Sequence, residues 1–247
     1  MRYPVLLAAA VVTVITGGDA TAAKPSQSVA RAVADPRRPA DDKAADPQRK
    51  PAETLTLAGV RPGMAVGEFY SGGGYYTRLL SNVVGASGHV YSLSNSGWGS
   101  SKEIAAAMGG KWKNVSFDSQ KFGTVGFPKR LDVVWLTQNY HDLKIPKYGN
   151  VDTVAFNREV YAALKPGGVY FIIDHQGRPD MTPDEITKLH RVNRDLVVRE
   201  VSSAGFKLAA EGDFLRNSAD DYGSPPSDEK VKGHTDRFVL KFVKPKR

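Results

Sequence analysis

From about residue 46 onward, the apolar positions form two recurring patterns, short continuous runs and spaced stripes. The runs lie at Met64–Tyr70, Gly88–Leu93, Leu131–Leu136 and Val169–Ile173. Such runs are typical of strands in a parallel sheet that is covered on both faces. Between them, apolar residues recur at three- and four-residue spacing, as in Tyr76, Leu79, Leu80, Val83 and Val84. Strands that alternate with amphipathic helices predict an α/β fold with one open sheet.

Capping residues mark several helix ends. The sequence Thr182-Pro183-Asp184-Glu185 forms a capping box with proline at the first helical position, so it predicts a helix start. Asp152 can cap the helix that precedes Lys165-Pro-Gly-Gly168. Pro51 suits the first turn of a short helix, and Gly59 suits its end.

The sequence Ser71-Gly72-Gly73-Gly74 lies between the first apolar run and the first helical stripe. Glycines allow the backbone to turn sharply and allow a ligand to approach it closely. The start of the following helix presents unpaired N–H groups and the positive end of the helix dipole. A strand, a glycine turn and a helix in this order are typical of nucleotide sites, including those of NAD-binding folds.

Two stretches carry a resemblance to a known family. Glu68-Phe-Tyr-Ser-Gly72-Gly-Gly74 resembles the first motif of class I S-adenosylmethionine-dependent methyltransferases, and residues 160–175 resemble the stretch before and through their fifth strand. The chain is also similar to bacterial predicted methyltransferases that carry a signal peptide. The resemblance implies a Rossmann-like open twisted sheet of seven strands, mostly parallel with an antiparallel last strand, and helices on both faces. Its last two strands would be Lys207 to Leu215 and Arg237 to Val243.

The resemblance also implies S-adenosylmethionine as cofactor and places residues around it. The cofactor-binding positions are Glu68, Tyr70, Gly72, Gly74, Ser94 and Asp118. Tyr70 stands where the family has its first glycine, and Ser94 stands where an acidic residue usually holds the ribose. Asp118 matches the residue that accepts a hydrogen bond from the adenine amino group. In the alternative interpretation, Ser94 belongs to a plain turn and Asp118 is an exposed loop residue.

Polar side chains follow two of the central strands at the edge where open α/β sheets bind ligands. They are Tyr140, His141 and Asp142 after Leu131–Leu136, and Asp174 and His175 after Val169–Ile173. We expect Tyr140, His141, Asp174 and His175 to be the catalytic residues on the side of a small-molecule substrate, with His141 as a candidate general base. In the alternative interpretation, His141 and Asp142 only hold the loop in place.

The N-terminal part of the chain has a different composition. Residues 1–23 have one Arg, an apolar core and then Ala20-Thr21-Ala22-Ala23, which predicts a cleaved secretory signal peptide, with an uncleaved membrane anchor as the alternative. We expect residues 24–45 to be a flexible leader and residues 46–247 to be the methyltransferase-like domain. In the family, a helix before the first strand lies over the cofactor, which would bring Arg49 and Lys50 near the site. We expect a periplasmic or secreted protein without stable membrane insertion after cleavage.

Composition limits the partners. The chain has 34 Lys and Arg against 26 Asp and Glu and no cysteine, so disulfides and cysteine-ligated metals are excluded. Basic residues form no long block and do not interleave with aromatic residues, so we expect no nucleic-acid binding. A general attraction to anionic envelope surfaces remains compatible with the charge.

Two other functions compete with methyl transfer. Export would separate the protein from cytoplasmic S-adenosylmethionine, and Tyr70 and Ser94 depart from the family pattern, so the chain could be an exported noncatalytic ligand-binding protein that retains the fold. A metal-dependent hydrolase would use His141, Asp142, Asp174 and His175. Adjacent strand residues point to opposite faces, which opposes convergence of all four on one ion, so we expect no metal.

The polar stretch from Arg216 to Asp236 is longer than a hairpin between two strands requires. If the strand before it runs parallel to its neighbours, the stretch begins at the same sheet edge as the glycine turn. We expect it to form part of the site entrance, with Tyr222 and His234 as candidate contacts. A disordered insertion is the alternative.

The signal-peptide hypothesis predicts a simple export phenotype. A fusion that lacks residues 1–23 should stay in the cytoplasm, whereas the full chain should be exported and shortened, as N-terminal sequencing of the soluble envelope fraction can establish. An intact N-terminus on the exported protein would reject the hypothesis.

Overall fold

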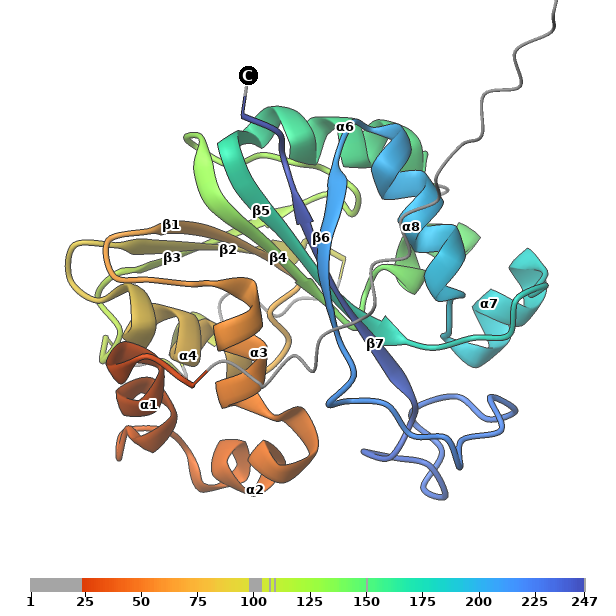
Figure 1. Cartoon of the computed structure of the whole chain (residues 1–247), viewed down its shortest axis with the longest axis horizontal. Coiled ribbons are helices and arrows are strands. Elements are labelled where there is room, and N and C mark those ends of the chain that lie inside the picture. The colour runs from red at the N-terminus through yellow and green to blue at the C-terminus, as the bar shows by residue number, and fades with distance from the viewer. Residues whose placement is uncertain (1–23, 98–103, 107, 109, 150, 247) are drawn as a thin grey trace, which may run out of the picture.

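The computed structural model describes residues 24–97, 104–106, 108, 110–149 and 151–246 (Figure 1). The expected signal peptide, residues 1–23, lies outside the described residues. The sequence also predicts a short alanine-rich helix from Ser101 to Met108, and residues 101–103 and 107 of it lie outside the described residues as well.

Seven strands form one mixed sheet in the order β3-β2-β1-β4-β5-β7-β6. They are β1 Ala65–Phe69, β2 His89–Asn95, β3 Val115–Gln120, β4 Leu131–Thr137, β5 Leu164–His175, β6 Lys207–Gly212 and β7 Arg237–Val243. Strands β1 to β5 are parallel, and β7 is antiparallel to both of its neighbours, β5 and β6. The predicted seven-stranded sheet with an antiparallel last strand is therefore confirmed, with β6 rather than β7 at the edge.

The helices cover both faces of the sheet (Figure 1). They are α1 Gln27–Ala34, α2 Ala40–Arg49, α3 Pro51–Ala58, α4 Tyr75–Val84, α6 Thr153–Ala163, α7 Pro183–Leu189 and α8 Arg194–Ser203, with short 3₁₀ helices η1 His141–Lys144 and η2 Pro146–Tyr148. Asp152 caps α6, and the Thr182–Glu185 capping box begins α7. These helix starts were predicted from the sequence and are confirmed.

Strand β4 shows how one apolar run supports two cores. Val133 and Trp135 pack into the core that also contains residues of α1, α3 and α4. Val134 and Leu136 point to the opposite core, which contains residues of α6 and α8. Alternate side chains of a strand point to opposite faces, so a strand covered on both faces must be apolar throughout.

The expectation of a flexible leader at residues 24–45 is wrong, because α1 and α2 occupy most of it. Ser26 caps α1, and Val29 and Ala32 lie at helical spacing and are buried. This apolar stripe is narrow and alanine-rich, so in the sequence it resembled an unstructured segment. The helix is stabilised by packing against α3 and α4 rather than by its own propensity.

Ion pairs hold α2 over the glycine turn. The Arg78 guanidinium donates to both carboxylate oxygens of Asp42, at 2.7 and 2.8 Å, and to the carbonyl of Gly73 at 2.8 Å. Arg38 pairs with Asp46, which also accepts a hydrogen bond from the Tyr75 hydroxyl at 2.7 Å. Several charged residues of the expected leader, among them Arg38 and Asp42, are therefore in ion pairs within the N-terminal helices or with α4.

Residues 213–236, which we call the connecting segment, join β6 to β7 and lie at the bottom of Figure 1. Buried Arg191 pairs with Asp220 at 2.8 Å. Asp236 accepts from Arg216 at 2.7 Å and donates its backbone N–H to Asp220 at 2.6 Å. The alternative of a disordered insertion is wrong, because this network fixes the segment at both ends.

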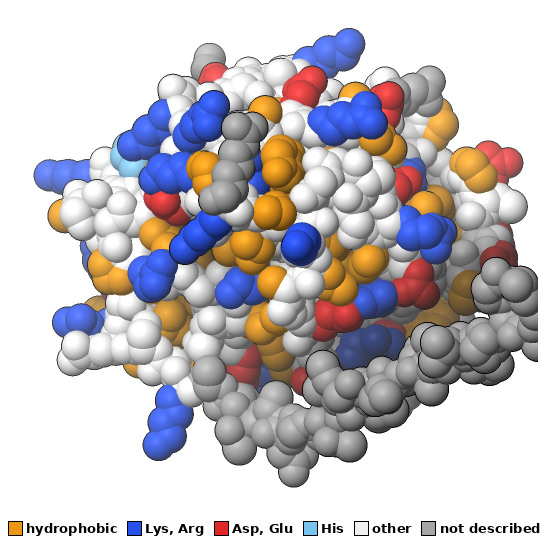
Figure 2. All heavy atoms as spheres, turned by 45° about the horizontal axis from the view of Figure 1, so that its top comes forward, with side chains coloured by type: hydrophobic (Ala, Val, Ile, Leu, Met, Phe, Trp, Pro, Cys, Tyr) orange, Lys and Arg blue, Asp and Glu red, His pale blue; other side chains and the backbone are white. Residues whose placement is uncertain are grey.

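The surface charge and the length of the helices relate to the expectations about nucleic acid and membrane. On the face in Figure 2, Lys and Arg are interspersed with acidic, uncharged and hydrophobic side chains. Among the residues that the structure describes, no helix is both long enough and apolar enough to cross a membrane.

The buried pair predicts a large effect at Asp220. Asp220→Ala leaves the Arg191 guanidinium buried without its charge partner, so the free energy of unfolding should fall by about 3–5 kcal/mol. Denaturant unfolding of the protein without residues 1–23 measures this. Glu229→Ala is the control, since Glu229 and its partner Lys232 are both exposed; equal stability of the two variants would contradict the assigned role of the pair.

Candidate functional site

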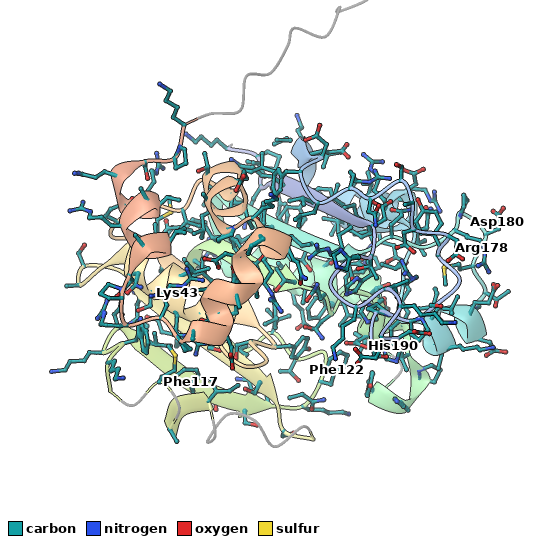
Figure 3. All side chains as sticks on the ribbon, turned by 90° about the horizontal axis from the view of Figure 1, so that it is seen from below. Lys43, Phe117, Phe122, Arg178, Asp180 and His190 are labelled. Atoms are coloured by element: carbon teal, nitrogen blue, oxygen red, sulfur yellow. The ribbon has the colours of Figure 1, made fainter. Side chains whose placement is uncertain are left out.

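The candidate site lies where β1 and β4 end side by side. The chain order on the two sides of this pair runs in opposite directions, β1-β2-β3 and β4-β5, and such a point is where open α/β sheets bind ligands. Figure 3 views the molecule from this edge and shows Phe122 and His190 on it. Two neighbouring cavities open here and share Gln138.

The first cavity has a volume of about 360 Å³ and lies between α2, the glycine turn and the end of β4. Its lining includes Arg49, Glu68, Ser71, Gly72, Gly73 and Gln138. Of the six predicted cofactor residues, Glu68, Tyr70 and Gly72 line it, whereas Gly74, Ser94 and Asp118 do not.

Glu68 is the buried acid of this cavity. Only 2% of the residue is exposed, and its Oε2 accepts a hydrogen bond from Thr77 at 2.6 Å. Burial raises the pKa of Glu68 to about 7, although Thr77 and the Arg78 charge act in the opposite direction. A carboxylate in this position gains from a positive group on a ligand, because such a group offsets the cost of its desolvation.

Other polar groups at this edge can receive a ligand. The Arg49 guanidinium lies over the ring of Tyr75, 4.5 Å from its centroid, and makes no hydrogen bond or ion pair with the residues that the structure describes. Within the same residues, the buried hydroxyls of Ser71 and Ser94 have no hydrogen-bond partner. Buried polar groups are normally satisfied, so partnerless ones indicate a ligand site. These groups fit a zwitterionic amino acid moiety beside a hydroxyl-bearing one.

Tyr70 differs from the glycine that the family has at this position. Its φ of +53° lies in the left-handed region, where the family has glycine and a tyrosine is strained. Its ring stacks on Phe122 at 4.6 Å, and its hydroxyl accepts from the backbone N–H of Gly123 at 3.0 Å. Because Phe122 and Gly123 follow β3, this contact lies on the side where the resemblance places the adenosine.

Gly74 and Asp118, two predicted cofactor residues outside the cavity lining, make their contacts with other parts of the protein. Gly74 has a φ of +79° at the start of α4, and a Cβ there would approach the Arg78 guanidinium to 2.9 Å. Asp118 lies within β3, exposed, and accepts from the backbone of Ser119 and from Gln120. Asp118 therefore lies on a strand, so the alternative interpretation of an exposed loop residue is wrong about the loop, and its predicted contact with adenine stays a prediction.

The second cavity, of about 430 Å³, is lined by residues of four separate segments. They are Gln138, His141, Asp142, His175, His190, Pro226 and Ser227. The connecting segment therefore reaches the site, as predicted, but through Pro226 and Ser227. Tyr222 instead donates to Asp236, and His234 is exposed.

His141 is buried between two carboxylates. Asp174 lies 2.7 Å from its Nδ1 and also accepts its backbone N–H at 2.8 Å, while Asp142 lies 3.3 Å from its Nε2. Burial alone lowers the pKa of His141, but the two carboxylates outweigh it and raise the pKa to about 10. In this state His141 is a cation, so the expectation that it acts as a general base is not supported.

The other predicted catalytic residues divide into three cases. Tyr140 is fully buried, donates to Glu200 at 2.9 Å and accepts from Asn157 at 2.8 Å, and it lines neither cavity. These contacts therefore give no support to its assignment as a substrate contact. Asp174 is also fully buried and positions His141. His175 does line the second cavity; burial and the nearby positive charges hold its pKa well below the usual range, so it is neutral.

No protein-family model and no curated protein matches this sequence. Solved structures do match. A SAM-dependent methyltransferase from Aquifex aeolicus shares 18% identity over 86% of this chain and 96% of its own, with a TM-score of 0.59. A [4+2]-cyclase shares 16% identity over 89% and 92%, with a TM-score of 0.59. Aeropyrum pernix fibrillarin with natively bound S-adenosyl-L-methionine shares 12% over 81% and 76%, with a TM-score of 0.51.

The chain has the class I methyltransferase fold. In this fold the strands, the glycine turn and the residues after β4 and β5 were all predictable. His190 was missed, because no local motif surrounds it. The one signal is that the helix predicted from the Thr182 capping box has no glycine at its end, and His190 takes the left-handed capping position with a φ of +49°.

The raised pKa of Glu68 predicts pH-dependent stability. Folding raises this pKa from 4.5 to about 7, so the protonated acid stabilises the folded state. This stabilisation is complete below pH 4.5 and is lost as the pH rises through 7, by about 3 kcal/mol in total.

Glu68→Gln should remove that dependence while keeping a group that accepts from Thr77. Denaturant unfolding between pH 4.5 and 8 should show a flatter profile for Glu68→Gln than for the unmodified protein. Glu53→Gln, at an exposed acid, should retain the original profile. Parallel profiles for Glu68→Gln and the unmodified protein would contradict the burial argument.

Proposed function

We propose that this protein is an S-adenosylmethionine-dependent methyltransferase that binds its cofactor in the first cavity. The observation that carries the proposal is buried Glu68 beside a glycine turn, at the end of β1 in a methyltransferase fold. A buried carboxylate with a raised pKa is costly without a cationic ligand. S-adenosylmethionine has such a group in its α-amino nitrogen.

Several residues that line the first cavity would hold the cofactor. Glu68 would receive the amino group, Arg49 the carboxylate, and the backbone of Ser71 to Gly73 would approach the same moiety. The Ser94 hydroxyl, at 2% exposure and without a partner among the described residues, would contact the ribose if the cofactor extends beyond the lining of the first cavity. Tyr70 and Phe122 would border the adenosine.

The second cavity would hold the methyl acceptor, a small molecule. When bound, S-adenosylmethionine supplies an electrophilic methyl group, so the protein needs chiefly to position the nucleophile. His141 and His175 both line this cavity, so their imidazoles can hydrogen-bond a polar part of the acceptor. Pro226 and Ser227 of the connecting segment cover this side and would exclude water.

One observation favours a second candidate, an exported ligand-binding protein without transfer activity. Tyr70 occupies the family's first glycine position and is tied to Phe122 and Gly123. The matched cyclase is an example of chemistry other than methyl transfer on this fold. In both candidate functions a ligand binds in the first cavity. They differ in whether that ligand transfers a methyl group to a second molecule. We propose a periplasmic or secreted location for either.

A pair of glycine variants tests the cofactor site. Gly72 lines the first cavity, has a φ of +52° and has open space where a Cβ would lie. Gly72→Leu should weaken S-adenosylmethionine binding by more than about 10-fold through loss of close backbone approach. Isothermal titration with the protein lacking residues 1–23 measures this affinity.

Gly85→Leu is the matched control. Gly85 also has a positive φ, +65°, and open space, but it lies at the other end of α4 and outside the first cavity. Gly72→Leu should lose about 1–2 kcal/mol of stability from the left-handed backbone. Gly85, with a ψ of −168°, lies in a region almost confined to glycine, so Gly85→Leu should lose at least as much stability, while only Gly72→Leu should lose binding. No binding by the unmodified protein, or equal binding by both variants, would reject the proposal.

A further inference from the structure

Three side chains of the second cavity bring ligand-type atoms together. His141 and Asp142 come from η1, and His190 ends α7. His141 Nε2 lies 3.3 Å from Asp142 Oδ1, and His190 Nδ1 lies 3.3 Å from the same oxygen. One ligand atom of each of the three residues lies within 4.8 Å of the others. The three atoms therefore lie close enough together to contact one cation.

Asp142 gives an independent sign of a ligand. Its side chain is 7% exposed, and its Oδ1 forms no hydrogen bond of normal geometry with any residue that the structure describes. The other oxygen, Oδ2, accepts from Asn139 at 2.8 Å. Two imidazole nitrogens, each 3.3 Å away, approach this buried oxygen without a hydrogen bond of normal geometry, and a cation between the three residues would satisfy it more fully.

The hydrogen bonds that hold His141 and Asp142 in place are of the kind found behind metal ligands. Metal-bound histidines usually direct their second ring nitrogen at a carboxylate, which fixes the ring orientation. His141 does so through Nδ1, 2.7 Å from Asp174. Asn139 orients Asp142 in the same manner. Asp142 and Asp174 also supply negative charge, which favours a divalent cation beside His141.

The distances agree with a small transition cation. Bonds of about 2.0–2.1 Å in tetrahedral directions separate neighbouring ligand atoms by about 3.3–3.4 Å. Both measured separations from Asp142 Oδ1 are 3.3 Å. Two imidazoles and one carboxylate favour Zn²⁺, Fe²⁺ or Mn²⁺ over Ca²⁺ and Mg²⁺, which prefer sites built from oxygen alone.

We propose that His141, Asp142 and His190 bind one divalent transition cation of the zinc class, with the remaining coordination position open to the second cavity. The strand-alternation argument against a metal does not apply, because His141 and Asp142 lie on a 3₁₀ helix rather than on a strand. Asp174 is a positioning residue, and His175 is not a ligand. An open position beside the cavity would let the cation bind an oxygen or nitrogen atom of a small molecule there.

The test uses untagged protein without residues 1–23, first freed of metal by a chelator. Titration calorimetry with Zn²⁺ should show one site per chain, and Co²⁺ should give a visible ligand-field absorption band. Mg²⁺ should produce neither. The site goes beyond the proposed function, so binding of S-adenosylmethionine in the first cavity should not require the metal.

His190→Gly is the most informative variant. It removes one ligand, and the fold should persist because glycine suits the left-handed capping position of φ +49°. Its affinity for Zn²⁺ should fall at least about 100-fold, and Asp142→Asn should also weaken binding. His234→Gln, at an exposed histidine of the connecting segment, is the control and should bind as the unmodified protein does.

Two results would overturn the proposal. One is the absence of saturable Zn²⁺ binding and of a Co²⁺ band in the unmodified protein. The other is binding that His190→Gly and Asp142→Asn leave unchanged, because the cation would then lie elsewhere. Circular dichroism of each variant establishes that it is folded before its affinity is compared.

Discussion

The side-by-side ending of β1 and β4 at the centre of the sheet is the constraint on which the site depends. Both strands are covered on both faces by apolar cores. Within a few residues of the end of each strand, the chain passes from these cores to space that a ligand can enter. Polar groups placed there are desolvated on the sheet side and open on the other. That is the condition in which charges interact strongly with a ligand and shift their pKa values. Tyr70 and Gln138, which directly follow these strands, both have left-handed backbone.

Glu68 and His141, both at this edge, show how burial shifts a pKa when opposite charges are distant and when they are close. Burial raises the pKa of Glu68 and outweighs the opposing effects of the Thr77 and Ser92 hydroxyls and of the Arg78 charge. His141 is just as buried, yet Asp174 and Asp142 flank it, and their charge overcomes burial. The first arrangement favours a cationic ligand. The second concentrates negative charge around one imidazole, which favours either a proton or a metal ion at the same place.

Segments from both ends of the described chain close the edge, and ion pairs fix them there. Asp42 of α2 is held by Arg78 of α4, so the N-terminal helices form one wall of the first cavity. Asp220 of the connecting segment is held by Arg191, next to His190, so that segment forms a wall of the second cavity. Each arginine lies beside a residue of the site. Breaking either pair would therefore be expected to affect ligand binding as well as stability.

From Pro51 onward, the sequence by itself determined the order of the main strands and helices, the glycine turn and the edge on which polar residues gather, but it did not reveal α1 and α2. Apolar period and capping are local properties, and parallel strands necessarily bring their carboxyl ends together. The tertiary structure alone decided which polar residues reach the cavities. Tyr140 is buried by Asn157 and Glu200 from other helices, and His190 joins His141 and Asp142 through the placement of α7. Burial and charge pairing are set by contacts between residues distant in the chain, and such contacts leave no period in the sequence.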